Sequence, residues 1–299
     1  MLKYLKFFLT AVAAFVSGLF FMSYQPSEAP VSVRQFIIPH VDPNREYSFA
    51  GERTPIENFD VKERLERELI INSYLHATVI LNLKNSTRYF PVIEKILKEN
   101  GIPEDFKYVA VAESNFRNTA TSGVGAKGVW QFMPATAPEY GLEVSDEVDE
   151  RMHLEKSTQA ACEYIKKKYA RFGSWTLAAA SYNMGASGLA EDMSEQRIEN
   201  YYDLNLSEET NRYIFRVLAI KEVLERPQDF GFDIAGEHQY EPMDDFKLVQ
   251  VSTSIESLGD FAKEHGTTYR MLKLYNPWLR GSKLMNRKGK VYEIKIPKG

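Results

Sequence analysis

Apolar residues recur at the spacing of amphipathic helices along most of the first 230 residues. Val61, Leu65 and Leu69 are four positions apart, for example, which places them on one helical face. Helices joined by short loops, without the alternating pattern of strands, indicate an all-α domain over residues 56–235. Its helices are expected over residues 60–83, 89–100, 103–114, 134–140, 157–172, 175–185 and 208–225.

Residues at the segment ends support several of these boundaries. Ser207 stands where an N-cap is expected and Pro227 stops the same helix, while Gly101 fits the left-handed position after another. Ser157 is predicted to cap the helix that it begins. Between the helices, the acidic stretch 144–153 is expected to be exposed, and residues 197–206 are expected to form a polar loop bearing tyrosines.

The pattern changes after residue 244. Residues 246–251 are rich in strand formers, and residues 291–297 alternate between apolar and polar positions. Two short helices are expected between them, over 255–265 and 269–275. The sequence therefore predicts a mainly α protein, with an all-α domain followed by a small β-α-α-β domain over residues 244–299.

The N-terminal residues have the layout of an export segment. Lys3 and Lys6 precede an apolar run over residues 7–22, so residues 1–24 are predicted to be a cleaved signal or an uncleaved inner-membrane anchor, and the pattern fits both. Residues 25–55, rich in Pro, Ser and charge, are predicted to be a linker or a loosely packed arm.

Composition narrows the possible functions. A net charge of −4 gives no electrostatic argument for binding nucleic acid. The single cysteine, Cys162, excludes a disulfide within the chain and a thiol metal cluster, and it is predicted to be a core residue. Its distance from the N-terminus also excludes a lipid-bearing first residue. No cofactor or metal is expected, and a monomer is predicted.

Glu113 stands at the end of an apolar helical stripe. Phe106, Val109 and Ala110 precede it at the i, i+3, i+4, i+7 spacing of one buried face. A carboxyl group among apolar neighbours tends to remain protonated with a raised pKa, as a general acid near neutral pH requires. The alternative is an ordinary solvated or ion-paired glutamate at a helix end.

Four short blocks give Glu113 its context. Glu113-Ser114 is followed by GVWQFMP at residues 128–134, by ASYNMG at 180–185 and by ETNRYI at 209–214. In this order, the blocks resemble the family 23 lytic transglycosylases, which have a lysozyme-like fold and cut peptidoglycan. The likeness covers residues 104–224. The sequence departs from the family pattern at three positions, Val129, Ser181 and Ile214. None of these exchanges removes a functional group.

The resemblance implies a single-acid mechanism. Glu113 would protonate the β-1,4 glycosidic oxygen between N-acetylmuramic acid and N-acetylglucosamine, then act as base on the sugar's own 6-hydroxyl to give a 1,6-anhydro end. Two alternatives remain open: a hydrolase like goose-type lysozyme, and a cell-wall-binding scaffold without catalysis. Glycan strands are the expected partner and envelope machinery a further one, in the periplasm or cell envelope.

Other residues of the blocks are candidates for substrate binding. Ser114 is predicted to bond Glu113 or substrate, with its own helix backbone as the alternative. Gln131 is predicted to orient Glu113 or contact a sugar. Met133, with Trp130 and Phe132, is predicted to form an apolar wall, and all three also fit a core role.

Three more candidates come from the later blocks. Tyr182 and Asn183 offer a hydroxyl and an amide to the N-acetyl and hydroxyl groups of a sugar, and Tyr213 is predicted to reach the acid and direct its proton. Taken alone, the two tyrosines also fit the core.

The C-terminal domain resembles a LysM module, which binds N-acetylglucosamine chains. Residues 252–255 read Ser-Thr-Ser-Ile where the family usually has Gly-Asp-Thr-Leu, so a packing domain without ligand remains the alternative. The order of export segment, catalytic domain and LysM-like tail is similar to that of membrane-bound lytic transglycosylases of the D type.

Overall fold

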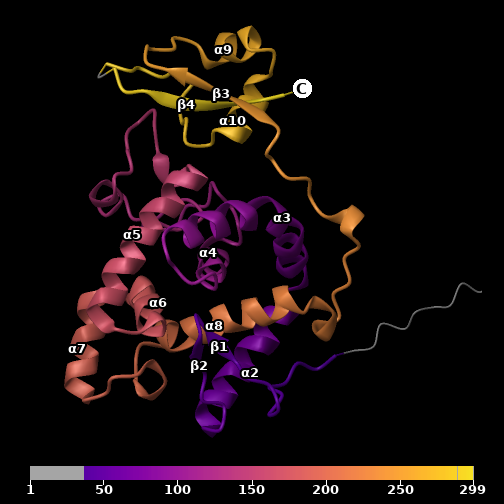
Figure 1. Cartoon of the computed structure of the whole chain (residues 1–299), viewed down its shortest axis with the longest axis vertical. Helices are drawn as coiled ribbons and strands as arrows, with labels where there is room; N and C mark the ends of the chain where they lie inside the picture. Colours follow the sequence, from indigo (N-terminus) through magenta and orange to yellow (C-terminus); the bar gives the residue numbers. More distant parts are fainter. Residues whose placement is uncertain (1–36, 288, 299) are drawn as a thin grey trace, which may run out of the picture. The chain divides into compact units, whose positions relative to one another are not determined.

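The computed structural model describes residues 37–287 and 289–298 (Figure 1). The predicted export segment over residues 1–24, with its apolar run 7–22, lies outside these residues. Within the described ranges, no helix has both the length and the apolar character that crossing a membrane requires.

The protein is mainly α, as predicted. The helices of the larger domain are α2 (Phe59–Tyr74), α3 (His76–Glu99), α4 (Phe106–Ser114), α5 (Leu154–Phe172), α6 (Trp175–Met184), α7 (Ala186–Gln196) and α8 (Glu208–Glu225). Short 3-10 turns are η1 (Ala137–Tyr140), η2 (Glu150–Met152), η3 (Tyr201–Asp203), η4 (Pro227–Phe230) and η5 (Gly236–His238). The helix α7 had no counterpart among the predicted segments.

Helix α8 lies at the centre of this domain and packs against α2, α4 and α6 (Figure 1). Its residues Ile214, Phe215 and Leu218 are fully buried. Its ends are as predicted, since the Ser207 side chain accepts a hydrogen bond from the Thr210 N–H and the helix ends before Pro227. The buried face of α8 therefore fixes where the side chains on its remaining face can lie.

The predicted boundary between the helices over residues 60–83 and 89–100 is wrong. The chain leaves helical geometry at Leu75, where ψ is 56°, and then continues from His76 to Glu99 as the single helix α3. In the polar middle of α3, the hydroxyls of Ser86 and Thr87 donate to the carbonyls of Leu83 and Lys84 in the preceding turn of the same helix. Gly101 has φ +68°, as predicted for the residue after this helix.

Helix α5 begins earlier than predicted. His153 is its N-cap residue, and Ser157 lies inside the helix with its hydroxyl donating to the Leu154 carbonyl. The predicted capping role of Ser157 is therefore wrong. Cys162, further along α5, is a free, buried thiol in the main core, as predicted.

The described part of the segment predicted to be a linker or loosely packed arm, residues 37–55, is not one. Tyr47 and Phe49 are buried in the main core, and Phe49 ends the first strand of a short hairpin, β1 (Ser48–Phe49) with β2 (Glu52–Arg53). The Glu52 carboxylate accepts hydrogen bonds from the N–H groups of Trp175 and Thr176 at the start of α6. This carboxylate satisfies backbone donors that the helix leaves unpaired.

The loop predicted over residues 197–206 is more structured than expected. It contains the turn η3, and both Tyr201 and Tyr202 are buried. The Tyr201 hydroxyl donates to the carbonyls of Thr210 and Asn211, so this segment is tied to the start of α8.

The acidic stretch over residues 144–153 was predicted to be exposed, and this is wrong for its second half. Asp149 and Glu150 are at most 1% exposed. Asp149 pairs with Arg151 and Lys127, and Glu150 pairs with Lys156 and Lys290. These cations hold the pKa of both carboxyl groups below the ordinary range despite their burial. Buried charge of this kind requires such partners.

The tail forms the predicted β-α-α-β domain. Strands β3 (Phe246–Val251) and β4 (Tyr292–Pro297) pair antiparallel, with Phe246 opposite Pro297, and helices α9 (Leu258–Glu264) and α10 (Tyr269–Tyr275) lie between them in the chain. Its own apolar cluster is formed by residues that include Leu258, Leu272, Trp278 and Ile294, with Val148 and Met152 of the acidic stretch.

The tail is joined to the larger domain by backbone hydrogen bonds. The Asp149 N–H donates to the Trp278 carbonyl and the Arg280 N–H donates to the Glu147 carbonyl, each at 2.8 Å. Lys290 adds an ion pair to Glu143 at 2.8 Å. This packing is what buries the acidic stretch.

Candidate active site

Glu113 lies in the last turn of α4, and the earlier members of its stripe are buried. Phe106, Val109 and Ala110 are fully buried, as the sequence predicts, while Glu113 is partly buried. Asn115, directly after the helix, has φ +50°, so the chain turns away immediately. The acid therefore stands at the end of a helix whose other face is anchored in the core.

Tyr213 contacts this acid directly. Its hydroxyl donates a hydrogen bond to Glu113 Oε1 at 2.5 Å, across a sequence separation of 100 residues, and the tyrosine is 1% exposed. Burial raises the pKa of Tyr213 well above its ordinary value, so the phenol remains a donor. The predicted meeting of Tyr213 with the acid is confirmed.

Burial also governs the protonation of Glu113. Desolvation raises its pKa above the ordinary value for glutamic acid, against the Tyr213 hydrogen bond and the charge of Arg216, which lower it. The charge of Glu209 adds to the raising effects. Glu113 thus has the perturbed carboxyl group that the sequence predicts for a general acid.

Tyr182 belongs to the same surroundings. The carboxylate of Glu113 is one of the groups that raise the pKa of Tyr182, after burial itself. The Tyr182 hydroxyl donates to the Trp130 carbonyl at 2.6 Å, and Asn183 accepts a hydrogen bond from the Thr210 hydroxyl at 2.9 Å. Helix α6 is therefore linked both to the 128–134 block and to the start of α8.

Gln131 and Ser114 bond to backbone groups. Gln131 has φ +49° and its amide donates to the Gly128 carbonyl at 2.8 Å, so it holds its own turn. Ser114 is 1% exposed, and its hydroxyl donates to the Ala110 carbonyl at 3.0 Å. Ser114 therefore bonds its own helix backbone, the alternative to a bond with Glu113 or substrate. In the structure, neither side chain has a hydrogen bond to Glu113 within the described residues.

The apolar wall of the 128–134 block divides into two kinds of residue. Trp130 is fully buried with its N–H donating to the Thr158 hydroxyl, and Phe132 is 4% exposed in the same core. Met133 is 39% exposed and is the member of this wall that a ligand can reach.

Sequence reasoning missed Arg216. Its guanidinium binds the Glu209 carboxylate through two hydrogen bonds of 2.9 and 3.2 Å, and both charges act on the pKa of Glu113. Residues 209, 213 and 216 follow the i, i+4, i+7 spacing of one helical face, and this spacing is the signal that was available. Taken alone, Glu209 in the first turn of α8 fits a simpler role, a favourable interaction with the helix dipole.

Replacing Tyr213 by Phe is expected to move the alkaline limb of the pH–rate profile to higher pH. The lost hydrogen bond lowers the pKa of Glu113, so its removal raises that pKa and keeps the acid protonated to higher pH. Since hydrogen bonds to charged groups contribute about 1.5–3 kcal/mol, the maximal rate should fall about tenfold or more. Turnover measured from about pH 4 to 9, in steps of about half a pH unit, gives both quantities.

Tyr201→Phe is the matched control, because that buried hydroxyl bonds carbonyls of α8 and not Glu113. An alkaline limb that moves equally in both variants would contradict a specific effect of Tyr213 on the acid.

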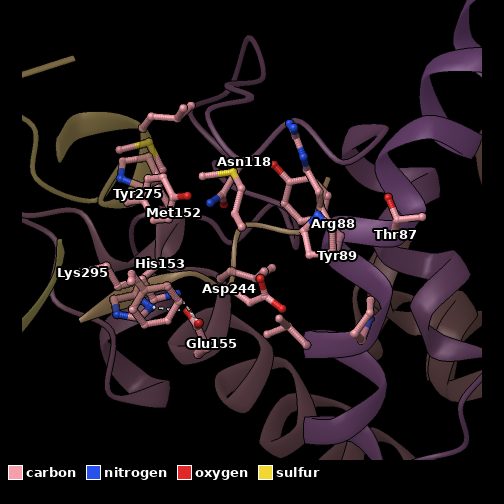
Figure 2. A pocket seen from close by; sticks show the side chains of 18 residues that line it. Thr87, Arg88, Tyr89, Asn118, Met152, His153, Glu155, Asp244, Tyr275 and Lys295 are labelled. Atoms are coloured by element: carbon pink, nitrogen blue, oxygen red, sulfur yellow. Dashed lines mark hydrogen bonds and ion pairs between the residues drawn. The ribbon is translucent and has the colours of Figure 1, made fainter. Parts of the chain in front are cut away.

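A separate hollow of about 300 Å³ lies between α3, the start of α5 and the tail. Figure 2 shows Tyr89, Asn118, His153 and Tyr275 around it, with none of the block residues discussed above among its lining. Within the described residues, no group of three or more His, Cys, Asp or Glu side chains is placed to hold a metal ion.

Comparison with known proteins adds to this geometry. Residues 90–205, which contain Glu113 and Tyr182, match the family model described as the transglycosylase SLT domain. The chain carries an SLT domain. Residues 247–299 match the model of the soluble lytic transglycosylase C-terminal LysM-like domain, so the predicted order of an SLT domain and a LysM-like tail is confirmed.

Curated relatives agree with the domain match. Membrane-bound lytic murein transglycosylase D of Escherichia coli strain K12 is 26% identical over 80% of this chain and 53% of the relative. Peptidoglycan transglycosylase gp16 of Escherichia phage T7 is 32% identical over 44% of this chain and 10% of its own length. The chain thus spans about half the length of the first relative. The 70 kDa soluble lytic transglycosylase of Escherichia coli gives a TM-score of 0.41 at 19% identity, over 60% of this chain and 30% of that one.

Proposed function

We propose that this protein is a peptidoglycan lytic transglycosylase that cleaves the β-1,4 bond between N-acetylmuramic acid and N-acetylglucosamine and leaves 1,6-anhydro ends. The observation that carries the proposal is the hydrogen bond from Tyr213 to a partly buried Glu113 with a raised pKa, inside an SLT domain. The names of the relatives, which include a lytic murein transglycosylase and a peptidoglycan transglycosylase, support it.

In the first step, protonated Glu113 gives its proton to the glycosidic oxygen. The bond between that oxygen and C1 of the muramic acid breaks, and the leaving sugar departs with a hydroxyl group. The oxygen of the N-acetyl group shields the positive charge that develops at C1. A carboxyl group with a raised pKa is suited to this donation near neutral pH.

In the second step, the Glu113 carboxylate accepts the proton of the sugar's own 6-hydroxyl as its oxygen bonds to C1. Glu113 is protonated again, no water is consumed, and the product has a 1,6-anhydro ring. Because the attacking hydroxyl is part of the substrate, proximity replaces a second catalytic carboxylate. The Tyr213 hydroxyl stabilises the carboxylate between the two steps, since it donates to Glu113 Oε1.

The ion pair between Glu209 and Arg216 favours a mechanism with one catalytic carboxyl group over a mechanism with two. Ordinary retaining and inverting glycosidases use two carboxyl groups with separate roles. Glu209 is the acid whose charge acts on Glu113, but its two oxygens are bound to Arg216, and this hydrogen bonding lowers the pKa of Glu209. A carboxylate held in this way is a poor base for activating water.

The remaining candidates would contact the substrate around this centre. Met133 offers an exposed apolar surface, Tyr182 on α6 is close enough to Glu113 for that charge to raise its pKa, and Asn183 is the next residue of α6. Gln131 and Ser114 would act indirectly, by fixing the backbone to which their side chains are hydrogen-bonded. The proposed place of action is the periplasm or cell envelope, with peptidoglycan strands as the partner.

Digestion of purified peptidoglycan by the full chain, followed by mass spectrometry of the products, tests the function. Products with 1,6-anhydro ends are expected, and Glu113→Gln is the control for contaminating activity. Reducing ends would instead indicate a hydrolase like goose-type lysozyme. Binding without any cleavage would indicate the scaffold alternative.

A further inference from the structure

A second hollow, of about 330 Å³, lies beside the catalytic helix and is lined by residues of α2, α3, α4 and α8. Ala112 and Asn115, on either side of Glu113 in sequence, contribute to its wall. Arg216 lines it too and also acts on the pKa of Glu113. Glu113 itself is not part of the lining, so an occupant of this hollow would lie beside the helix that carries the acid.

Asn82 gives the hollow a buried polar atom that needs a partner. The residue is 4% exposed, and its amide nitrogen donates to the Asn115 side-chain oxygen at 3.1 Å. Its own side-chain oxygen is buried and accepts no hydrogen bond from any described residue. Because a buried acceptor is destabilising without a donor, this atom calls for an N–H or O–H group from a ligand or water.

The charges around the hollow are largely paired within the protein. Arg212 donates to Glu68 at 2.7 Å, and Glu68 is 1% exposed. Arg216 is bound by Glu209 through two hydrogen bonds. With its guanidinium groups already facing carboxylates, the site has no unpaired cation to select an acidic ligand, while the N–H edges of Arg212 and Arg216 still suit a carbonyl oxygen.

Apolar side chains complete the wall. Val79, Ile220 and Val223 line the hollow, and each is at most 8% exposed. A group that fits these surroundings is uncharged, donates one hydrogen bond, accepts another and carries a small alkyl group. A secondary amide bearing a methyl or similar group has all of these properties.

We propose that this hollow beside α4 binds a secondary amide of the substrate strand and thereby helps to hold the strand at Glu113. The inference rests on the proposed function, because peptidoglycan is the substrate that would supply the amide groups. Peptidoglycan carries such groups in two places, the N-acetyl groups of its sugars and the alanine-containing peptide stems.

Thr78→Trp tests the proposal by filling the hollow. Thr78 lines it from the first turn of α3 and is partly buried, whereas its neighbour Ala77 is exposed and is not part of the lining. Ala77→Trp is therefore the matched control, with the same added side chain one position away. Both variants are made in the Glu113→Gln background, so that binding is measured without cleavage.

Binding is measured for two ligands, glycan strands with their peptide stems and strands from which an amidase has removed the stems. Thr78→Trp is expected to weaken binding by at least about tenfold, while Ala77→Trp changes it by less than roughly twofold. Loss with stem-bearing strands alone assigns the amide to the stem. Equal loss with both assigns it to the N-acetyl group.

Unchanged binding of both ligands by Thr78→Trp would overturn the proposal. Thermal unfolding checks that each variant is folded, and Thr78→Met, which extends less far, replaces Thr78→Trp if the latter does not fold. Because the readout is binding, it remains decisive even if digestion yields no 1,6-anhydro ends, and the two proposals can fail separately.

Discussion

Glu113→Gln is expected to reduce turnover of peptidoglycan by about 10²–10⁴-fold, the range that general acid–base catalysis contributes. The amide has nearly the shape of the acid and its oxygen can still accept the Tyr213 hydrogen bond, but it has no proton to donate in the first step. Since the proposed mechanism uses this one group as acid and then as base, both steps would lose their catalyst. The loss of turnover is measured from initial rates on purified peptidoglycan, with the products quantified in samples stopped at fixed times.

The fold and the binding of strands should survive this change. The stripe of α4 that anchors the helix, Phe106, Val109 and Ala110, is untouched. A variant that keeps more than about a tenth of the turnover while remaining folded would show that another group donates the proton.

Gly128→Ala is expected to destabilise the protein by about 3–5 kcal/mol, at the upper end of single-substitution effects. A Cβ atom at this position would lie 1.8 Å from the Arg151 carbonyl oxygen, and the residue has φ +80°. Neither the backbone at Arg151 nor that of the 128–134 block can move freely, because Arg151 is buried and bound to Asp149. Urea unfolding followed by circular dichroism measures the change in the free energy of unfolding.

Gly123→Ala is its control within the same loop. A Cβ there meets no atom within 4 Å, and this glycine is exposed. Its unfolding free energy should change by less than about 0.5 kcal/mol. Equal effects of the two substitutions would contradict the role assigned to the close approach of Gly128 and Arg151.

Local physics made several features predictable. The stripe that ends in Glu113 follows from helical periodicity, and the ends of α8 follow from a serine N-cap and a proline that stops the helix. The β-α-α-β order of the tail follows from a change in pattern after residue 244. Each of these depends on residues that are close together in the sequence.

Features that depend on distant residues were harder to predict. The meeting of Tyr213 with Glu113 joins two helices across 100 positions, and the resemblance of four blocks predicted it where periodicity alone could not. Asp149 and Glu150 look like surface residues in sequence, because their partners Lys127 and Lys290 come from other segments. Burial of Tyr47 likewise depends on a core that the sequence around it does not reveal.

The proposed mechanism depends most on the protonation state of one side chain. Titration of the Glu113 carboxyl carbon by NMR, in protein labelled with ¹³C at glutamate side chains, measures that state directly, and the signal is assigned by its absence in Glu113→Gln. The proposed mechanism and the burial of Glu113 predict a midpoint clearly above the ordinary glutamic acid value of about 4.3. A midpoint at or below that value would show that Glu113 is ionised near neutral pH and would contradict its role as the acid.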